Sequence, residues 1–203
     1  MSHQILLTRI PVWFVGVVVV LGADCAPKAP SEADRVPPPI IPAHTAASGK
    51  LTFEAPSGWI AQSPQTSMRV AQYELPRAEG DSENASLVVY YFGQGQGGSV
   101  EANLERWMHQ MEQPDGRPSK ERARIETMTV NGLNVTLLDL TGTYRAEIMP
   151  GQGARYHKPG FRMRAAVIET PRGPYFVKLV GPEKTVHRWD EAFMAFIRSM
   201  RFQ

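Results

Sequence analysis

Basic and aromatic residues gather in one irregular part of the sequence. Residues 145–160 read RAEIMPGQGARYHKPG, and irregular stretches of this length inside a compact domain are often functional. In the strand predicted next, 161–170, two arginines share one face because side chains two positions apart point the same way. We expect a basic, partly aromatic surface that binds a protein or a small ligand, the alternative being an ordinary solvated loop. The predicted contact residues are Arg155, His157, Lys158, Arg162 and Arg164.

The same region suggests a catalytic alternative that uses His157 with Asp139. Hydrolases of the serine type need a nucleophile, a base and an orienting acid close together. Two of the five histidines, His109 and His187, fall on the polar sides of predicted helices, and only His157 lies on the long loop. No Gly-x-Ser-x-Gly motif occurs. We therefore expect a binding protein rather than an enzyme, with a small hydrolase or metal-dependent enzyme as the alternative.

Neither a metal nor a cofactor is expected. No pair of histidines and no carboxylate-rich loop has the spacing of metal ligands. The glycine-rich tract at 93–98, GQGQGG, lacks the Lys-Ser/Thr ending of a phosphate-binding loop. We interpret this tract as a flexible connection between a strand and a helix.

The beginning of the chain has the pattern of an export signal. Arg9 precedes an apolar run over residues 10–21, which is within the length of a secretory signal and short for a membrane span. Residues 21–25, LGADC, resemble the lipobox of bacterial lipoproteins, in which the cysteine is acylated. We expect a signal peptide over 1–24 and a lipid anchor on Cys25. Alternatives are plain secretion after cleavage near Ala23 or Ala26, or an uncleaved anchor.

A proline-rich linker is predicted between this cysteine and the folded domain. Residues 25–50 contain six prolines and few apolar side chains, so we expect a disordered, semi-extended tether. The domain then covers 51–203. The net charge of the chain is +2, without the concentrated basic face of a nucleic-acid-binding protein. The expected partners are a membrane, through the lipid, and an envelope protein.

Alternating and apolar runs predict a sheet flanked by helices. Strands are expected at 51–54, 67–75, 85–92, 123–130, 133–144, 161–170 and 175–180. In the second of these, Arg69 is expected on the same face as Ala71, Tyr73 and Leu75. The pair Asn131-Gly132 predicts a two-residue hairpin.

Two helices are predicted. One follows Ser99 as N-cap and ends before Pro114, with an apolar stripe that we assign to the core rather than to a ligand pocket. The other begins at Pro182 and closes the domain. The predicted class is α+β, with a mostly antiparallel sheet of six to seven strands between helices.

Short motifs in the domain carry a family resemblance. Phe53–Trp59, FEAPSGW, resembles the opening Pro-x-Gly-Trp strand of the PsbP-like superfamily, named for an extrinsic subunit of photosystem II. The helix pattern Asn103, Arg106, Trp107 and Gln110 resembles uncharacterised bacterial envelope proteins of that group. The resemblance covers about 51–202 and implies an α/β/α sandwich. It implies no particular activity, since this fold serves binding and assembly.

Overall fold

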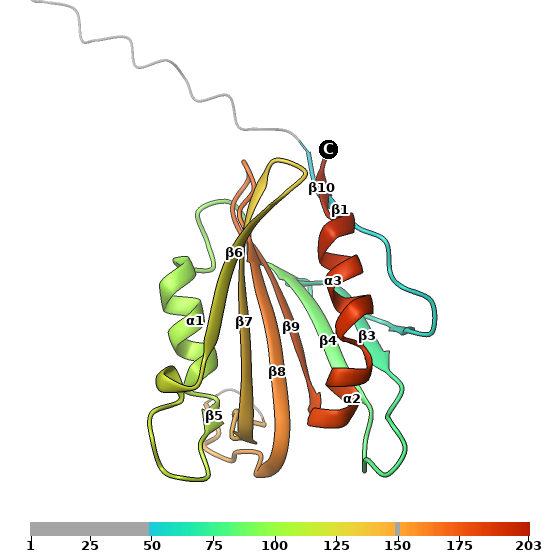
Figure 1. Ribbon diagram of the computed structural model, residues 1–203. Coiled ribbons are helices and arrows are strands. Elements are labelled where there is room, and N and C mark those ends of the chain that lie inside the picture. Colours follow the sequence, from blue (N-terminus) through green and yellow to red (C-terminus); the bar gives the residue numbers. More distant parts are fainter. Residues whose placement is uncertain (1–48, 149–150) are drawn as a thin grey trace, which may run out of the picture. The chain divides into compact units, whose positions relative to one another are not determined.

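The domain is built on one antiparallel sheet with helices against both of its faces (Figure 1). A computed structural model describes residues 49–148 and 151–203. The predictions for the signal peptide, for Cys25 and for the linker as far as residue 48 lie outside the described residues. Within the described part, no helix is long and apolar enough to cross a membrane.

The main sheet has eight strands, one or two more than predicted. Their order is β2-β3-β4-β9-β8-β7-β5, with β6 paired to β7 beside β5. A separate two-stranded sheet joins β1 to β10, the two ends of the domain. The predicted class, α+β with a mostly antiparallel sheet, is confirmed. The bounds are β1 Leu51–Thr52, β2 Ile60–Gln62, β3 Arg69–Leu75, β4 Ala85–Tyr91, β5 Met111–Glu112, β6 Arg124–Val130, β7 Leu133–Tyr144, β8 Lys158–Ile168, β9 Tyr175–Pro182 and β10 Arg201–Phe202.

The hairpin between β6 and β7 is confirmed at the predicted residues. Asn131 and Gly132 have φ values of 49° and 81°, which is what a two-residue type I′ turn requires. The Asn131 side chain also donates hydrogen bonds to the carbonyl oxygens of Arg198 (3.1 Å) and Met200 (2.8 Å). This turn therefore connects the hairpin to the end of the last helix.

Helix α1, Val100–Met108, covers part of one face of the sheet. The predicted N-cap is correct, because Ser99 Oγ accepts a hydrogen bond from the backbone N–H of Ala102 at 3.2 Å. Leu104 and Trp107 pack against strands β7, β8 and β9, as the predicted core stripe requires. Met111, which falls within the helix predicted between Ser99 and Pro114, belongs to β5 instead. A short 3-10 turn, η2 (Ser119–Glu121), follows β5.

The predicted C-terminal helix consists of two helices on the opposite face. Helix α2 covers Glu183–Arg188 and α3 covers Asp190–Ser199, with Trp189 between them. The Trp189 indole N–H donates to the carbonyl oxygen of Pro76 at 2.9 Å. Phe193 and Phe196 of α3 are fully buried in a second core cluster. The two clusters lie on opposite sides of the sheet because side chains alternate along each strand.

Candidate functional site

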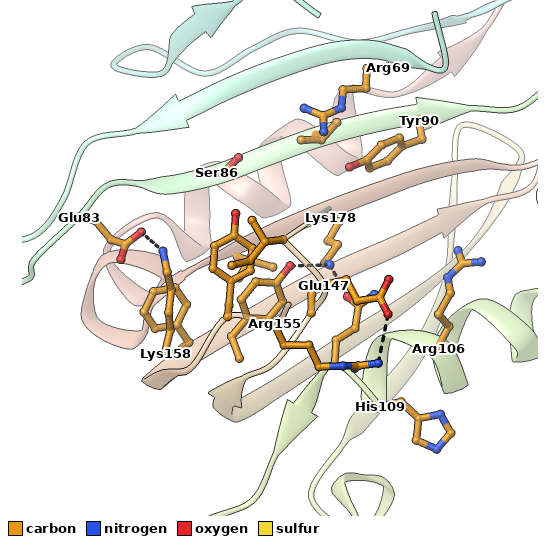
Figure 2. A pocket seen from close by; sticks show the side chains of 18 of the residues that line it. Arg69, Glu83, Ser86, Tyr90, Arg106, His109, Glu147, Arg155, Lys158 and Lys178 are labelled. Atoms are coloured by element: carbon orange, nitrogen blue, oxygen red, sulfur yellow. Dashed lines mark hydrogen bonds and ion pairs between the residues drawn. The ribbon is translucent and has the colours of Figure 1, made fainter. Parts of the chain in front are cut away.

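A large cleft lies beside α1, on the same face of the sheet. Its volume is about 1060 Å³, at the upper end of the roughly 300–1,000 Å³ typical of small-molecule sites. Strands β4 and β9 form the floor, and one side of α1 forms a wall. The facing wall is formed by Tyr144, residues 146–148, Arg155, Tyr156 and Lys158. Figure 2 shows Arg106 and His109 extending from α1, with Lys178 near the middle of the group.

Cationic side chains outnumber carboxylates in this cleft. It is lined by five Arg and Lys residues and by three glutamates. Two of the cations have acidic partners: Lys158 contacts Glu83 at 2.5 Å, and Arg155 contacts Glu147 at 3.4 Å. Within the described part of the chain, the other three have no carboxylate within ion-pair distance. These unpaired cations are Arg69, Arg106 and Lys178.

Lys178 occupies the centre of the sheet. It lies in β9 opposite Val88 of β4 on one side and Ala165 of β8 on the other. Burial, together with the positive charge of Arg106, lowers the pKa of Lys178 from 10.5 to about 7. Its Nζ donates hydrogen bonds to Gln110 Oε1 and to Tyr144 Oη, the latter at 3.1 Å. The amine is therefore held in position with little favourable charge around it.

Helix α1 and the turn after it orient two of the cationic groups through polar side chains. Asn103 is fully buried, and its Nδ2 donates at 2.8 Å to the carbonyl oxygens of Gly97 and Ser99. Its Oδ1 accepts a hydrogen bond from Arg106. One turn after Arg106, Gln110 accepts the hydrogen bond from Lys178. The helix pattern singled out in the sequence thus supports both Arg106 and Lys178.

Arg69 reaches the cleft because of an irregularity in β3. The register between β3 and β4 shifts between Arg69 and Ala71, so that Arg69 lies opposite Tyr90. The bulge moves Arg69 to the α1 face, whereas Ala71 and Tyr73 pack in the other core. Our prediction that all three share a face was wrong for Arg69, because one extra residue inverts the alternation of side chains. The guanidinium lies 5.8 Å from the centre of the Tyr90 ring.

Aromatic rings complete the wall that faces α1. The ring centroid of Tyr144 lies 5.7 Å from that of Tyr156 and 6.3 Å from that of Phe161, both in stacked orientation. Burial, with smaller contributions from Tyr90 and Tyr156, raises the pKa of Tyr144. Its phenol is therefore protonated at neutral pH. Beside the cations, this part of the cleft offers flat apolar surface to a ligand.

The structure divides the five predicted contact residues. Arg155 and Lys158 line the cleft, although each is paired with a glutamate. His157 is exposed and does not line it. Arg162 and Arg164 lie on the opposite face of the sheet, where their side chains are only 13% and 12% exposed. The five residues therefore do not form the single patch that we expected.

On that opposite face, Arg162 and Arg164 belong to a nearly neutral ion-pair cluster. Arg162 donates two hydrogen bonds of 2.7 Å to the carboxylate of Asp139 and one of 2.8 Å to Asp190. Arg164 also donates to Asp190 and lies 5.0 Å from the ring of Phe193. Although burial alone would raise it, the two guanidinium groups hold the pKa of Asp190 below its ordinary value. This cluster links α3 to β7 and β8.

The catalytic alternative receives no geometric support. The carboxylate of Asp139 is engaged by Arg162 on the α3 side of the sheet. His157 lies just before β8, whereas Asp139 pairs with Arg164 inside that strand. His157 also does not line the cleft. In residues 49–148 and 151–203, no group of three or more His, Cys, Asp or Glu side chains is placed to hold a metal ion.

Sequence reasoning missed the three unpaired cations. A usable signal existed for Lys178, which is the one charged residue in the run YFVKLVGP of β9. A charge in the middle of a central, otherwise apolar strand needs an explanation. For Arg106 the signal was the helix pattern itself, which we used only for resemblance. The bulge that redirects Arg69 has no sequence signal that we can identify.

Comparisons with known proteins add little to this site. No protein-family model matches the chain, and no curated protein matches it. One similar solved structure is PA94 of Pseudomonas aeruginosa, a protein of unknown function, with TM-score 0.39, 15% identity, and coverage of 63% of this chain and 78% of that one. Another is LpqN, involved in cell envelope biogenesis of Mycobacterium tuberculosis, with TM-score 0.47, 10% identity, and coverage of 77% and 84%. At TM-scores below 0.5, neither similarity supports an argument about this chain.

Proposed function

We propose that this chain is a lipid-anchored extracytoplasmic accessory protein whose domain binds an anionic ligand in the cleft. The observation that carries the binding role is that two arginines of the cleft, Arg69 and Arg106, have no carboxylate within ion-pair distance among the described residues. Cationic groups kept away from carboxylates in a concave site attract an anion, and hydrogen bonds to charged groups are the stronger ones. A carboxylate, phosphate or sulfate group of the ligand would occupy the floor.

The lining also indicates a ligand with an apolar body. Val88 and Val180 lie on the floor, and Tyr144, Tyr156 and Phe161 lie on the wall. Sites for small molecules combine such surface with a few placed polar groups. A volume of about 1060 Å³ is far more than a free phosphate ion requires. An acyl or aromatic compound with one anionic end fits this chemistry.

The location outside the cytoplasm is part of the proposal and rests on the sequence. The apolar run over 10–21 and the lipobox-like residues 21–25 support export and acylation of Cys25. The linker over 25–50 would then separate the domain from a bacterial membrane. A PsbP-like assignment of the fold also belongs to this proposal and depends on the motifs described above. None of these features requires the chain to be an enzyme.

The binding role is tested by calorimetric titration of the full chain with phenyl phosphate, which combines a ring with a dianion. We expect the double variant Arg69→Gln/Arg106→Gln to bind at least about tenfold more weakly, because each charge-assisted hydrogen bond contributes about 1.5–3 kcal/mol. The matched control is Arg155→Gln, which removes a cleft arginine already paired with Glu147. The proposed role would be contradicted if the double variant and Arg155→Gln lost the same affinity for phenyl phosphate, or if the wild type did not bind it.

The anchor is tested by intact mass of the protein from the membrane fraction. We expect the mass of a chain cleaved before Cys25 and carrying acyl groups, and we expect Cys25→Ser to lose both the acyl groups and the membrane association. An unacylated soluble product from both forms would remove the lipid anchor from the proposal. The expected envelope partner is tested separately, by comparing the proteins pulled down with the wild type and with Arg155→Glu/Lys158→Glu. Unchanged partners would contradict binding at these two residues.

A further inference from the structure

Lys178 differs from the other cleft cations in how its hydrogen bonds are satisfied. Its Nζ donates to two acceptors among the described residues, Gln110 Oε1 and Tyr144 Oη. A lysine ammonium has three N–H groups to satisfy, whereas the neutral amine has two. Two acceptors are enough for the neutral amine, and no third acceptor among the described residues lies within hydrogen-bond distance of Nζ in the cleft that Lys178 lines.

The surroundings of Lys178 favour the same state. No carboxylate lies within ion-pair distance of it in the described part of the chain, and the neighbouring Arg106 repels a second positive charge. With burial, these effects lower the pKa of Lys178 to about 7. A lysine that is desolvated beside another cation is an activated nucleophile for carbonyl compounds.

We propose that Lys178 is a reversible covalent capture site, whose amine condenses with the aldehyde or ketone group of an anionic compound held by Arg69 and Arg106. The Lys178 nitrogen attacks the carbonyl carbon and forms a C–N bond. The carbonyl oxygen then leaves as water with the two amine hydrogens, and a C=N bond remains. Water reverses the reaction, and no oxidant or reductant takes part.

Tyr144 is placed to assist this condensation. Its hydroxyl lies 3.1 Å from Lys178 Nζ, and burial keeps it protonated at neutral pH. The phenol can therefore donate a hydrogen bond to the oxygen that departs from the carbonyl carbon. Gln110 meanwhile holds the amine from the α1 side. The orientation of the captured compound rests on the proposed function, because the arginines would hold its anionic end.

The test uses two aldehydes that differ by one carboxylate, 4-formylbenzoate and benzaldehyde. The full chain is incubated with each at pH 7.5, the imine is trapped with cyanoborohydride, and modified lysines are located by peptide mass spectrometry. We expect 4-formylbenzoate to label Lys178 at least about tenfold faster than Lys158 at the cleft rim. Benzaldehyde should label Lys178 at least about tenfold more slowly than 4-formylbenzoate does. Arg69→Gln/Arg106→Gln should remove that difference between the two aldehydes.

The variants keep the two proposals separable. Lys178→Arg should abolish the preferred label while Lys158→Arg leaves it, with circular dichroism confirming that each variant is folded. Labelling spread evenly over the lysines of the folded protein overturns covalent capture. If phenyl phosphate still binds in that case, the proposed function stands alone. If Lys178 is labelled selectively but equally by both aldehydes and phenyl phosphate does not bind, the orientation by the arginines is overturned.

Discussion

Replacement of Lys178 by methionine should stabilise the fold at neutral pH, and this gain should shrink as the pH rises. In the folded state Lys178 has a pKa of about 7, against 10.5 for the ordinary group. Between these values the unfolded chain carries a proton on Lys178 and the folded chain does not. The unfolded state then binds more protons, so the contribution of Lys178 to the free energy of unfolding increases with pH.

The magnitude follows from the two pKa values. Each pH unit between them changes the relative stability by about 1.4 kcal/mol. From pH 7 to pH 9 the wild type should gain about 2 kcal/mol relative to Lys178→Met. Because part of the Lys178 side chain is exposed to the cleft, we expect a measured gain of about 1–2 kcal/mol. Well below pH 7 the amine is protonated in both states, so the difference should be constant there.

The assay is urea unfolding of the full chain, followed by circular dichroism at pH 6, 7, 8 and 9. The difference in free energy of unfolding between wild type and variant isolates Lys178, because the other titrating groups are common to both. The matched control is Lys158→Met, which removes a lysine of the cleft rim that contacts Glu83. A difference for Lys178→Met that does not change between pH 7 and pH 9 would refute the neutral amine and weaken the covalent inference.

Three further substitutions test the supports of the site and the sheet. Asn103→Ala should lower the free energy of unfolding by about 1–3 kcal/mol, because buried carbonyls lose their donor, and calorimetry should show weaker phenyl phosphate binding as Arg106 loses its support. Asp190→Asn should destabilise the fold by about 1–2 kcal/mol above pH 4. Since the folded pKa of Asp190 is lowered, urea unfolding should show this difference shrinking as the pH falls through that value. Gly142→Ala would place a Cβ 2.7 Å from the Glu112 carbonyl oxygen at a φ of 154°, so hydrogen exchange of β5 should accelerate by about tenfold or more.

The elements that follow from local pattern were predictable. The Asn131-Gly132 turn, the Ser99 N-cap and the long strands β4 and β7 each depend on residues close together in sequence. The predictions failed where a contact with a distant part of the chain determines the local structure. Strand β5 has two residues, and it approaches β7 closely at Gly142, where a Cβ would lie 2.7 Å from the Glu112 carbonyl oxygen. The C-terminal helix divides at Trp189, where the indole contacts Pro76 far along the chain.

The cleft was harder to predict than the fold because its parts come from separate strands. Arg69, Arg106 and Lys178 lie on β3, α1 and β9, and they reach one face through the sheet order, the bulge in β3 and the packing of α1. Our interpretation gave weight to charge density along the sequence, which favoured residues 145–164. That criterion selects exposed loops and does not show whether each cation already has a partner. In the structure, Arg155 and Lys158 have glutamate partners, whereas the other three have no carboxylate within ion-pair distance among the described residues.

Buried charged groups have partners of opposite charge on the α3 face of the sheet but not on the α1 face. This contrast is the strongest argument for a function on the α1 side. On the α3 face, Arg162 and Arg164 are balanced by Asp139 and Asp190, so their charges are compatible with burial. On the α1 face, Lys178 is desolvated with no such balance, at an expense in folding free energy that methionine would avoid. Local conflicts of this kind are expected where a site has another task. An anion from outside the chain would supply the missing charge, and a carbonyl compound would remove the need for it.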